Sequence, residues 1–217
     1  MKGQPQQSAL RKLLSAIREP APTRFAPLAG LFVGAVAAAV YLVATQLWPS
    51  SIALVLSMLA SALLTHEVRN ASRATQADVL TQVFYFLLKY SVLLALSAAK
   101  LPFPTPASVP LGLIMICGYG ASRALVVTLL ASLPRQRAAR LSNLDLLFAL
   151  ITGLAPALLL GIPGLVGLAV AIVVCIGYGS YLKSSHGYLA DGLLTLTPLL
   201  AELSFYLGAQ ASWSYVS

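Results

Sequence analysis

Seven apolar segments, separated by short polar stretches, constrain the fold of this chain more than any other feature. They are residues 27–48, 52–64, 79–99, 109–133, 144–160, 165–182 and 188–208. A helix needs about 20 apolar residues to cross the hydrocarbon core of a bilayer, and most of the segments approach or exceed that length. Only 9% of the 217 residues are charged, against about 25% in a soluble domain, so the charges could not cover a water-facing surface. The sequence therefore predicts an all-α fold, a polytopic membrane helical bundle of about seven transmembrane helices.

The number of crossings has one alternative. The segments 52–64 and 144–160 are short for a complete crossing, which leaves six crossings open. Lys and Arg favour cytosolic loops. With a cytosolic N-terminus, seven crossings place eleven of the fourteen Lys and Arg residues inside, in 1–24, 65–78, 133–143 and 183–187. This asymmetry favours seven crossings and predicts a multi-pass protein of the bacterial inner membrane with its N-terminus in the cytosol.

The domain organisation follows from the same pattern. Residues 1–24 are polar and basic and have no apolar core, so they do not resemble a cleavable signal peptide. We expect a cytosolic basic tail over 1–24 and a single transmembrane helical domain over 25–217. The net charge of +8 indicates attraction to anionic membrane lipid, and we expect no nucleic-acid partner.

Three charged residues, Lys89, Arg123 and Glu202, lie inside apolar segments. A charge at the centre of a membrane helix costs roughly 2.5–3.5 kcal/mol on the insertion scale, so each requires a partner, a polar cavity or a route to the interface. Arg123 and Glu202 lie at similar depth, roughly 14 and 16 Å from the cytosolic edge. We therefore expect them to pair, either as a structural ion pair or as part of a polar cavity open to the cytosol. Lys89 is expected to extend toward the interface or to pair with a carboxylate.

Polar residues also gather on the predicted cytosolic side. Carboxylates could hold Mg²⁺ there, and cations could hold phosphate. This combination is typical of phosphoryl transfer, although loop polarity together with a helix-pairing charge would give the same pattern. The set is His66, Glu67, Asp78, Arg123, His186, Asp191 and Glu202.

Several stretches, in order along the chain, resemble the adenosylcobinamide-GDP ribazoletransferases, or cobalamin synthases. The sequence "TRFAPLAGLFVGAVAAAVYLV" is similar to the family's first span, and "ALLTHEVRNASRAT" lies where the family has an acidic His-Glu segment. The stretches "DVLTQVFYFLLKYSVLLALS" and "GASRALVVTLLASLPRQR" resemble the next helix and the family's Ser-Arg span. Finally, "GYLADGLLTLTPLLAELSFYLG" is similar to its closing Gly-x-Thr-Gly-Asp segment and later Glu-Leu. The resemblance covers most of residues 23–210.

This resemblance implies an enzyme that joins ribazole, or its phosphate, to adenosylcobinamide-GDP and releases GMP in cobalamin biosynthesis, with Mg²⁺ as cofactor. Its partners would then be a corrinoid nucleotide, a ribazole-type substrate and membrane lipid, with a homo-oligomer or other cobalamin-pathway proteins as further candidates. The implied catalytic residues are Asp191, Glu67 and His66, the metal ligands Glu67, Asp78 and Asp191, and the substrate-binding residues Arg123 and His186.

The sequence also departs from the family pattern. Three aspartates that follow His-Glu in the family correspond to Val68, Ser72 and Thr75, and the loop that follows is shorter. The family's Thr-Gly-Asp has become Leu189-Ala190-Asp191. Two alternatives therefore stay open: a catalytically silent relative that binds or scaffolds corrinoid-pathway proteins, and a small transporter that uses the buried charges.

Overall fold

A computed structural model describes residues 25–65, 76–98, 108–132, 142–186 and 191–216, and these residues form helices and short turns without strands. The all-α prediction is confirmed, and the seven described helices match the seven apolar segments. They are α2 (Ala26–Ala44), α3 (Ser50–Leu64), α5 (Gln76–Ala98), α6 (Ser108–Ser132), α7 (Asn143–Leu158), α8 (Ile162–His186) and α9 (Asp191–Val216).

Three helix boundaries have a clear local cause. Pro49 is the N-cap residue of α3, in an extended conformation that cannot continue α2. Ser142 is the N-cap residue of α7, and its hydroxyl accepts hydrogen bonds from the backbone N–H groups of Leu144 and Asp145. Gly161 lies between α7 and α8 with a φ of +65°, a left-handed conformation that glycine adopts without the clash of a Cβ.

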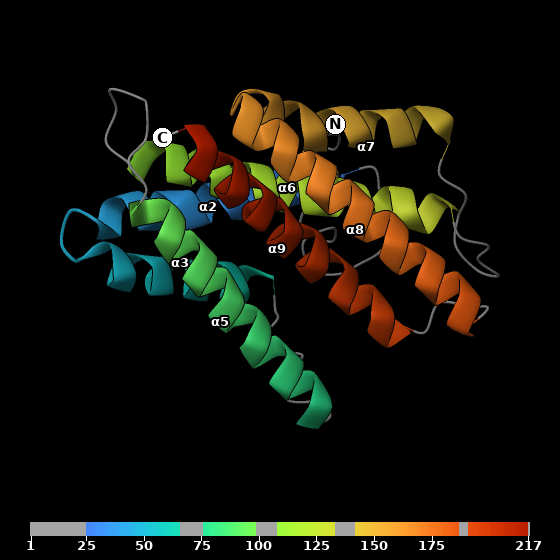
Figure 1. Cartoon of the computed structure of the whole chain (residues 1–217), viewed down its shortest axis with the longest axis horizontal. Coiled ribbons are helices and arrows are strands. Elements are labelled where there is room, and N and C mark those ends of the chain that lie inside the picture. Colours follow the sequence, from blue (N-terminus) through green and yellow to red (C-terminus); the bar gives the residue numbers. More distant parts are fainter. Residues whose placement is uncertain (1–24, 66–75, 99–107, 133–141, 187–190, 217) are drawn as a thin grey trace, which may run out of the picture.

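Helix α6 lies at the centre of the bundle and contacts α2, α5, α7, α8 and α9, and α2 packs along it (Figure 1). Gly30 and Gly34 of α2 face α6, and a Cβ at Gly34 would lie 2.7 Å from the Cα of Ile116. The Gly-x-x-x-Gly step thus brings two backbones into close contact, as expected for packing in membranes. Helix α7 contacts α6 through Gly153 and Gly120, and α3 packs on α2, where the Ser57 hydroxyl donates to the Ala37 carbonyl at 2.7 Å.

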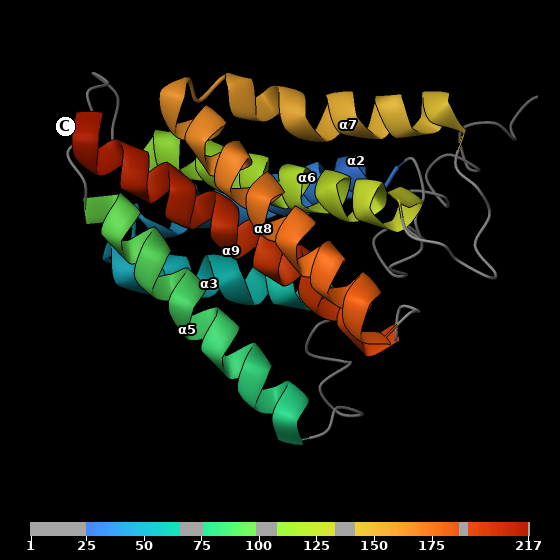
Figure 2. The ribbon, with the colours of Figure 1, turned by 45° about the vertical axis from the view of Figure 1, so that its right-hand side comes forward.

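Helices α5, α8 and α9 cross the other four at a slant in both ribbon views (Figures 1 and 2). Helix α8 packs along α9 in the opposite direction, and Gly167 and Gly208 meet in that contact. Helix α9 in turn packs on α6 and α5, so its middle is buried on several sides.

Large apolar side chains remain exposed on the outside of the bundle, for example Val43, Phe84, Leu159 and Val173. Four helical segments of the described part are long and apolar enough to cross a membrane: Ala26–Ala44, Val79–Ala98, Val109–Leu129 and Ile162–Tyr181. Helices α3 and α7, with 15 and 16 residues, are shorter apolar helices, as the sequence predicted. The protein is therefore a helical membrane bundle. Seven complete crossings, the domain division at residue 25 and the orientation of the N-terminus stay predictions.

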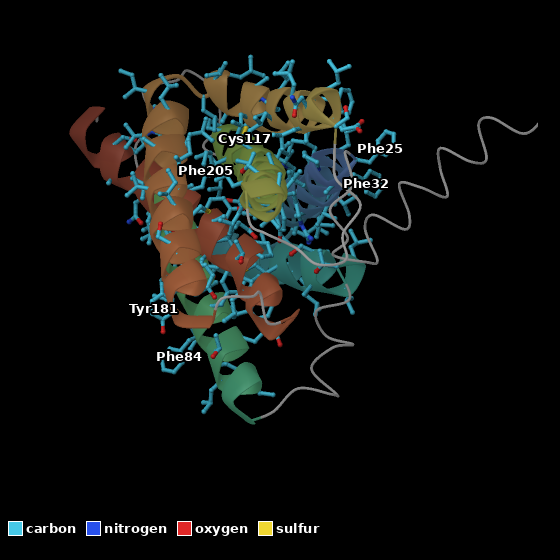
Figure 3. The ribbon with its side chains drawn as sticks, turned by 90° about the vertical axis from the view of Figure 1, so that its right-hand side faces the viewer. Phe25, Phe32, Phe84, Cys117, Tyr181 and Phe205 are labelled. Atoms are coloured by element: carbon cyan, nitrogen blue, oxygen red, sulfur yellow. The ribbon has the colours of Figure 1, made fainter. Side chains whose placement is uncertain are left out.

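The helix ends that border the expected cytosolic segments point toward one end of the bundle. Helices α3, α6 and α8 end toward the right of Figure 1, and α5, α7 and α9 begin toward that side. We call this the loop-side end. Figure 3 views the bundle from it.

Candidate functional site

A buried polar cluster lies where α5, α6 and α9 meet. Lys89 of α5 and Glu202 of α9 form an ion pair of 2.6 Å between Lys89 Nζ and Glu202 Oε1, and both side chains are almost completely buried. The other members are tyrosines, Tyr85 of α5, Tyr119 of α6 and Tyr206 of α9. We call these five residues the Lys–Glu cluster.

Phenol groups complete the hydrogen bonding of the ion pair. Tyr85 donates to Glu202 Oε2 at 2.7 Å, and Tyr206 donates to Glu202 Oε1 at 2.8 Å. Lys89 Nζ donates to the Tyr119 hydroxyl at 2.7 Å. The ammonium also lies 4.3 Å from the centre of the Tyr119 ring, within cation–π range. The carboxylate thus has three donors, which is the condition under which a buried ion pair is tolerated.

Helical spacing explains how the sequence builds this cluster. Tyr85 and Lys89 are four residues apart on α5, and Glu202 and Tyr206 are four residues apart on α9, so each pair shares one helix face. Gly118 of α6 makes room for the third helix, because a Cβ there would lie 2.7 Å from Cζ of Tyr206. Each helix therefore contributes a defined face to the cluster.

The expected pairing of Arg123 with Glu202 is wrong. Glu202 pairs with Lys89, and Arg123 makes no hydrogen bond or ion pair within the part of the chain that the structure describes. Equal depth is not sufficient for pairing, because the rotation about the helix axis also decides which side chains face each other. Gly118 marks the side of α6 that faces α9. Position 123 is five residues further along α6, which corresponds to a rotation of about 140°. Arg123 therefore faces α2, where a Cβ added to Gly30 would lie 2.8 Å from Cγ of Arg123.

The buried charges are otherwise as the sequence predicted. Lys89 and Glu202 are buried inside helices, and Lys89 takes the carboxylate partner that was one of its two expected arrangements. Arg123 is half-buried. Its role in substrate binding stays a prediction.

The remaining site predictions lie at the edge of the structure or outside it. His66 and Glu67 lie outside the described residues. Asp78, His186 and Asp191 belong to α5, α8 and α9, but their side chains lie outside the described part. Among the described residues, no three His, Cys, Asp or Glu side chains form a group that could hold a metal ion. Their proposed roles are therefore untested.

The helix ends nevertheless give these positions a common location. Asp191 is the first residue of α9, Asp78 is in the first turn of α5 and His186 is the last residue of α8. All three helix ends point toward the loop-side end (Figures 1 and 3). The chain also leaves α3 at Leu64 toward this end, two residues before His66.

The N-terminal part of the chain is similar to a known protein family. Residues 11–68 match the family model CobS, cobalamin-5-phosphate synthase. The resemblance to the cobalamin synthase family is thereby confirmed over about a quarter of the chain. The matched segment includes α2, α3, His66 and Glu67, and it relates the protein to cobalamin biosynthesis.

The comparisons do not extend this match. No curated protein and no solved structure matched the chain. The cobalamin synthase relation therefore rests on residues 11–68, and the specific reaction, the metal and the substrates belong to the proposal below.

Sequence reasoning missed the three tyrosines of the Lys–Glu cluster. The signal was present, because Tyr85 lies four residues before Lys89 and Tyr206 four residues after Glu202. A search for donors one helical turn from each buried charge would have found both. Tyr119 has a charge one turn away on its own helix, Arg123, but its partner is Lys89, and only the packing of α6 on α5 reveals this.

Proposed function

We propose that this protein is a membrane-embedded transferase of the cobalamin synthase type. It would join ribazole, or its phosphate, to adenosylcobinamide-GDP at the loop-side end of the bundle, which we place in the cytosol. The observation that carries the proposal is the family match over residues 11–68. The family description names cobalamin-5-phosphate, which is the product expected when ribazole phosphate is the acceptor.

The proposed reaction is a phosphoryl-centred substitution. A ribazole hydroxyl attacks the phosphorus atom attached to cobinamide, a new phosphorus–oxygen bond forms, and the bond to the bridging oxygen of GMP breaks. The hydroxyl proton leaves during the attack, and GMP carries away the electron pair of the broken bond. Such reactions depend mainly on positioning and on stabilisation of negative charge.

The residues proposed for this chemistry come from the loop-side end. Glu67, Asp78 and Asp191 are the proposed ligands of Mg²⁺, and His66 is a candidate for accepting the hydroxyl proton. Mg²⁺ accepts one or two protein carboxylates together with substrate phosphates and water, so a set of three is sufficient. When bound, the ion would neutralise phosphate charge. Arg123 and His186 would orient the phosphates.

The common direction of α5 and α9 supports this ligand set. Asp78 and Asp191 both lie in the first turn of a helix that begins at the loop-side end. A carboxylate in the first turn is favoured by the helix dipole, and two such positions on neighbouring parallel helices can serve one ion.

One sequence observation favours a second function. Val68, Ser72 and Thr75 stand where the family has aspartates, and fewer acids would weaken a metal–phosphate site. The alternative is a silent relative that binds corrinoid-pathway proteins without turnover.

A direct assay separates the two functions. Purified protein is incubated with adenosylcobinamide-GDP, ribazole phosphate and Mg²⁺, beside a relative that has the full acidic segment. The transferase proposal expects cobalamin phosphate and GMP from both proteins. Product from the relative alone would refute it and leave the silent relative.

Site variants test the residues. Asp191→Asn is expected to abolish Mg²⁺-dependent transfer, because it removes a proposed ligand. Asp145→Asn, in the first turn of α7 beside the Ser142 cap, is the matched control and is expected to keep activity. Equal loss in both variants would contradict the assignment of Asp191.

A further inference from the structure

The described side chains in the first part of α5 are not buried. None of the described side chains from Val79 to Phe84 is buried, and the first buried side chain is Tyr85. The next buried side chain is Lys89, and the first buried aliphatic side chain of α5 is Val92. Counted from Val79, the first buried side chains of α5 therefore belong to the Lys–Glu cluster.

The ion pair also joins α5 and α9 at matching positions. Lys89 lies eleven residues after Asp78, and Glu202 lies eleven residues after Asp191. Both helices begin at the loop-side end, so they run in the same direction past the ion pair (Figure 1). Eleven helical residues span about 16 Å, which places positions 78 and 191 at equal distance from the pair.

The helical rotation matches as well. Eleven residues correspond to about 1,100°, which is three turns plus about 20°. Position 78 thus falls on the side of α5 that carries Lys89, and position 191 falls on the side of α9 that carries Glu202. The ion pair shows that these two sides face each other. A shift of either helix by one turn would place the two aspartate positions about 5 Å apart along the axes.

We propose that the Lys89–Glu202 ion pair is a register lock: it fixes the first half of α5 against α9 so that Asp78 and Asp191 reach the same level at the loop-side end. Lys89 and Glu202 are then positioning residues, and they do not touch substrate. The tyrosines hold the lock in one geometry, because Tyr85 and Tyr206 occupy the carboxylate from both helices. The equal level of positions 78 and 191 is a property of the fold. Only its use, to bring two metal ligands together, rests on the proposed function.

The lock is tested by a distance measurement between spin labels. One label replaces Phe84 of α5 and the other replaces Tyr181 of α8, the helix packed along α9. Both side chains are exposed and lie on the outside of the bundle near the loop-side end (Figure 3). The buried Cys117 and Cys175 are changed to alanine in the background. A control pair replaces Leu147 of α7 and Val173 of α8, which are exposed and lie outside α5.

The expected result is a narrow Phe84–Tyr181 distance distribution in the parent and a broad, displaced one in Lys89→Met. The exchanged variant Lys89→Glu/Glu202→Lys restores the pair with reversed charges and is expected to narrow the distribution again. The control distance stays unchanged in each variant. If Lys89→Met does not fold, Glu202→Gln serves in its place, because it keeps the side-chain shape and removes the charge. A parent-like distribution in the charge-removed variant overturns the proposal.

Transfer activity is measured on the same samples. Misplacement of reacting groups by about 1 Å can reduce a rate about 100-fold, so we expect a loss of that order in Lys89→Met and substantial recovery in the exchanged variant. Full activity despite a displaced α5 would overturn the role of the lock at the site. If the distances respond as expected but the parent makes no product, the register lock stands and the proposed transferase function fails.

Discussion

Removal of one partner from the Lys–Glu cluster should destabilise the protein more than removal of both. In soluble proteins, deleting one member of a buried ion pair costs about 3–5 kcal/mol, because the other charge is left unpaired. Glu202 would keep two phenol donors in Lys89→Met, so we expect about 3 kcal/mol for this variant. Glu202→Gln leaves the Lys89 ammonium with the Tyr119 hydroxyl and ring, and we expect about 2–3 kcal/mol.

The double variant Lys89→Met/Glu202→Gln contains neither charge. Only interhelical hydrogen bonds are lost, and these contribute about 0.6 to 1.7 kcal/mol in membrane proteins. The single variants together are expected to cost about 5–6 kcal/mol. The double variant is expected to cost only about 1–2 kcal/mol, which corresponds to a coupling energy of about 3–5 kcal/mol.

Equilibrium unfolding by SDS in mixed micelles measures these free energies. The matched control is Arg123→Met combined with Glu202→Gln, since Arg123 makes no ion pair with a described residue and should be additive with Glu202. Independent sites add to within about 0.5 kcal/mol. A measured coupling free energy between Lys89 and Glu202 below that value would refute the conclusion that the two charges stabilise each other.

Three further predictions concern packing, hydrogen bonding and topology. Gly30→Ala should destabilise the bundle, because the added Cβ would collide with the Tyr119 carbonyl and approach Arg123. In the control Gly177→Ala the Cβ has nothing within 4 Å, so this change should be neutral or stabilising by up to about 1 kcal/mol. Equal thermal stability of the two variants would contradict the α2–α6 contact. Tyr206→Phe should lower the unfolding free energy by about 0.6–1.7 kcal/mol, and loss of the effect in a Glu202→Gln background would assign it to the bond with Glu202. Ser142 and Gln46 are both exposed, and they lie at opposite ends of the bundle. A cysteine at position 142 should therefore react with an impermeant reagent only from the cytosol, and a cysteine at position 46 only from the opposite side. Labelling of both positions from one side would exclude the predicted orientation.

The sequence was sufficient for the number and boundaries of the helices because lipid imposes a strong, simple pattern. Each of the seven apolar segments became a helix, with boundaries that agree within a few residues in most cases. The largest extensions beyond the predicted segments lie at the C-terminal ends of α8 and α9, which continue to His186 and Val216, whereas α2 ends earlier than predicted, at Ala44. Both extensions contain polar residues, and hydropathy does not distinguish a helix that leaves the apolar region from a loop.

The partner of Glu202 could not be predicted from depth alone. Depth depends on sequence position, whereas pairing also depends on which side of each helix faces its neighbours. Lys89 lies eleven residues after Asp78 and so has a depth similar to that of Arg123, and only the packing of α9 between α5 and α6 selects Lys89. Gly118, which makes room for the Tyr206 ring, indicated the correct side of α6, but a single glycine does not identify what will occupy the space beside it.

The glycine contact between α2 and α6 has a consequence for how this chain can change over time. Along α2 most buried residues are alanine or glycine, while Phe32 and Val43 face outward. Outward positions have only lipid beside them and can exchange one apolar side chain for another at little cost. Positions 30 and 34 have the backbone of α6 beside them, so even one added methyl group requires two helices to move. Substitutions that the protein tolerates should therefore recur along α2 with the period of the helix, and a complete mutational scan of this one segment would reveal its orientation in the bundle without any structure.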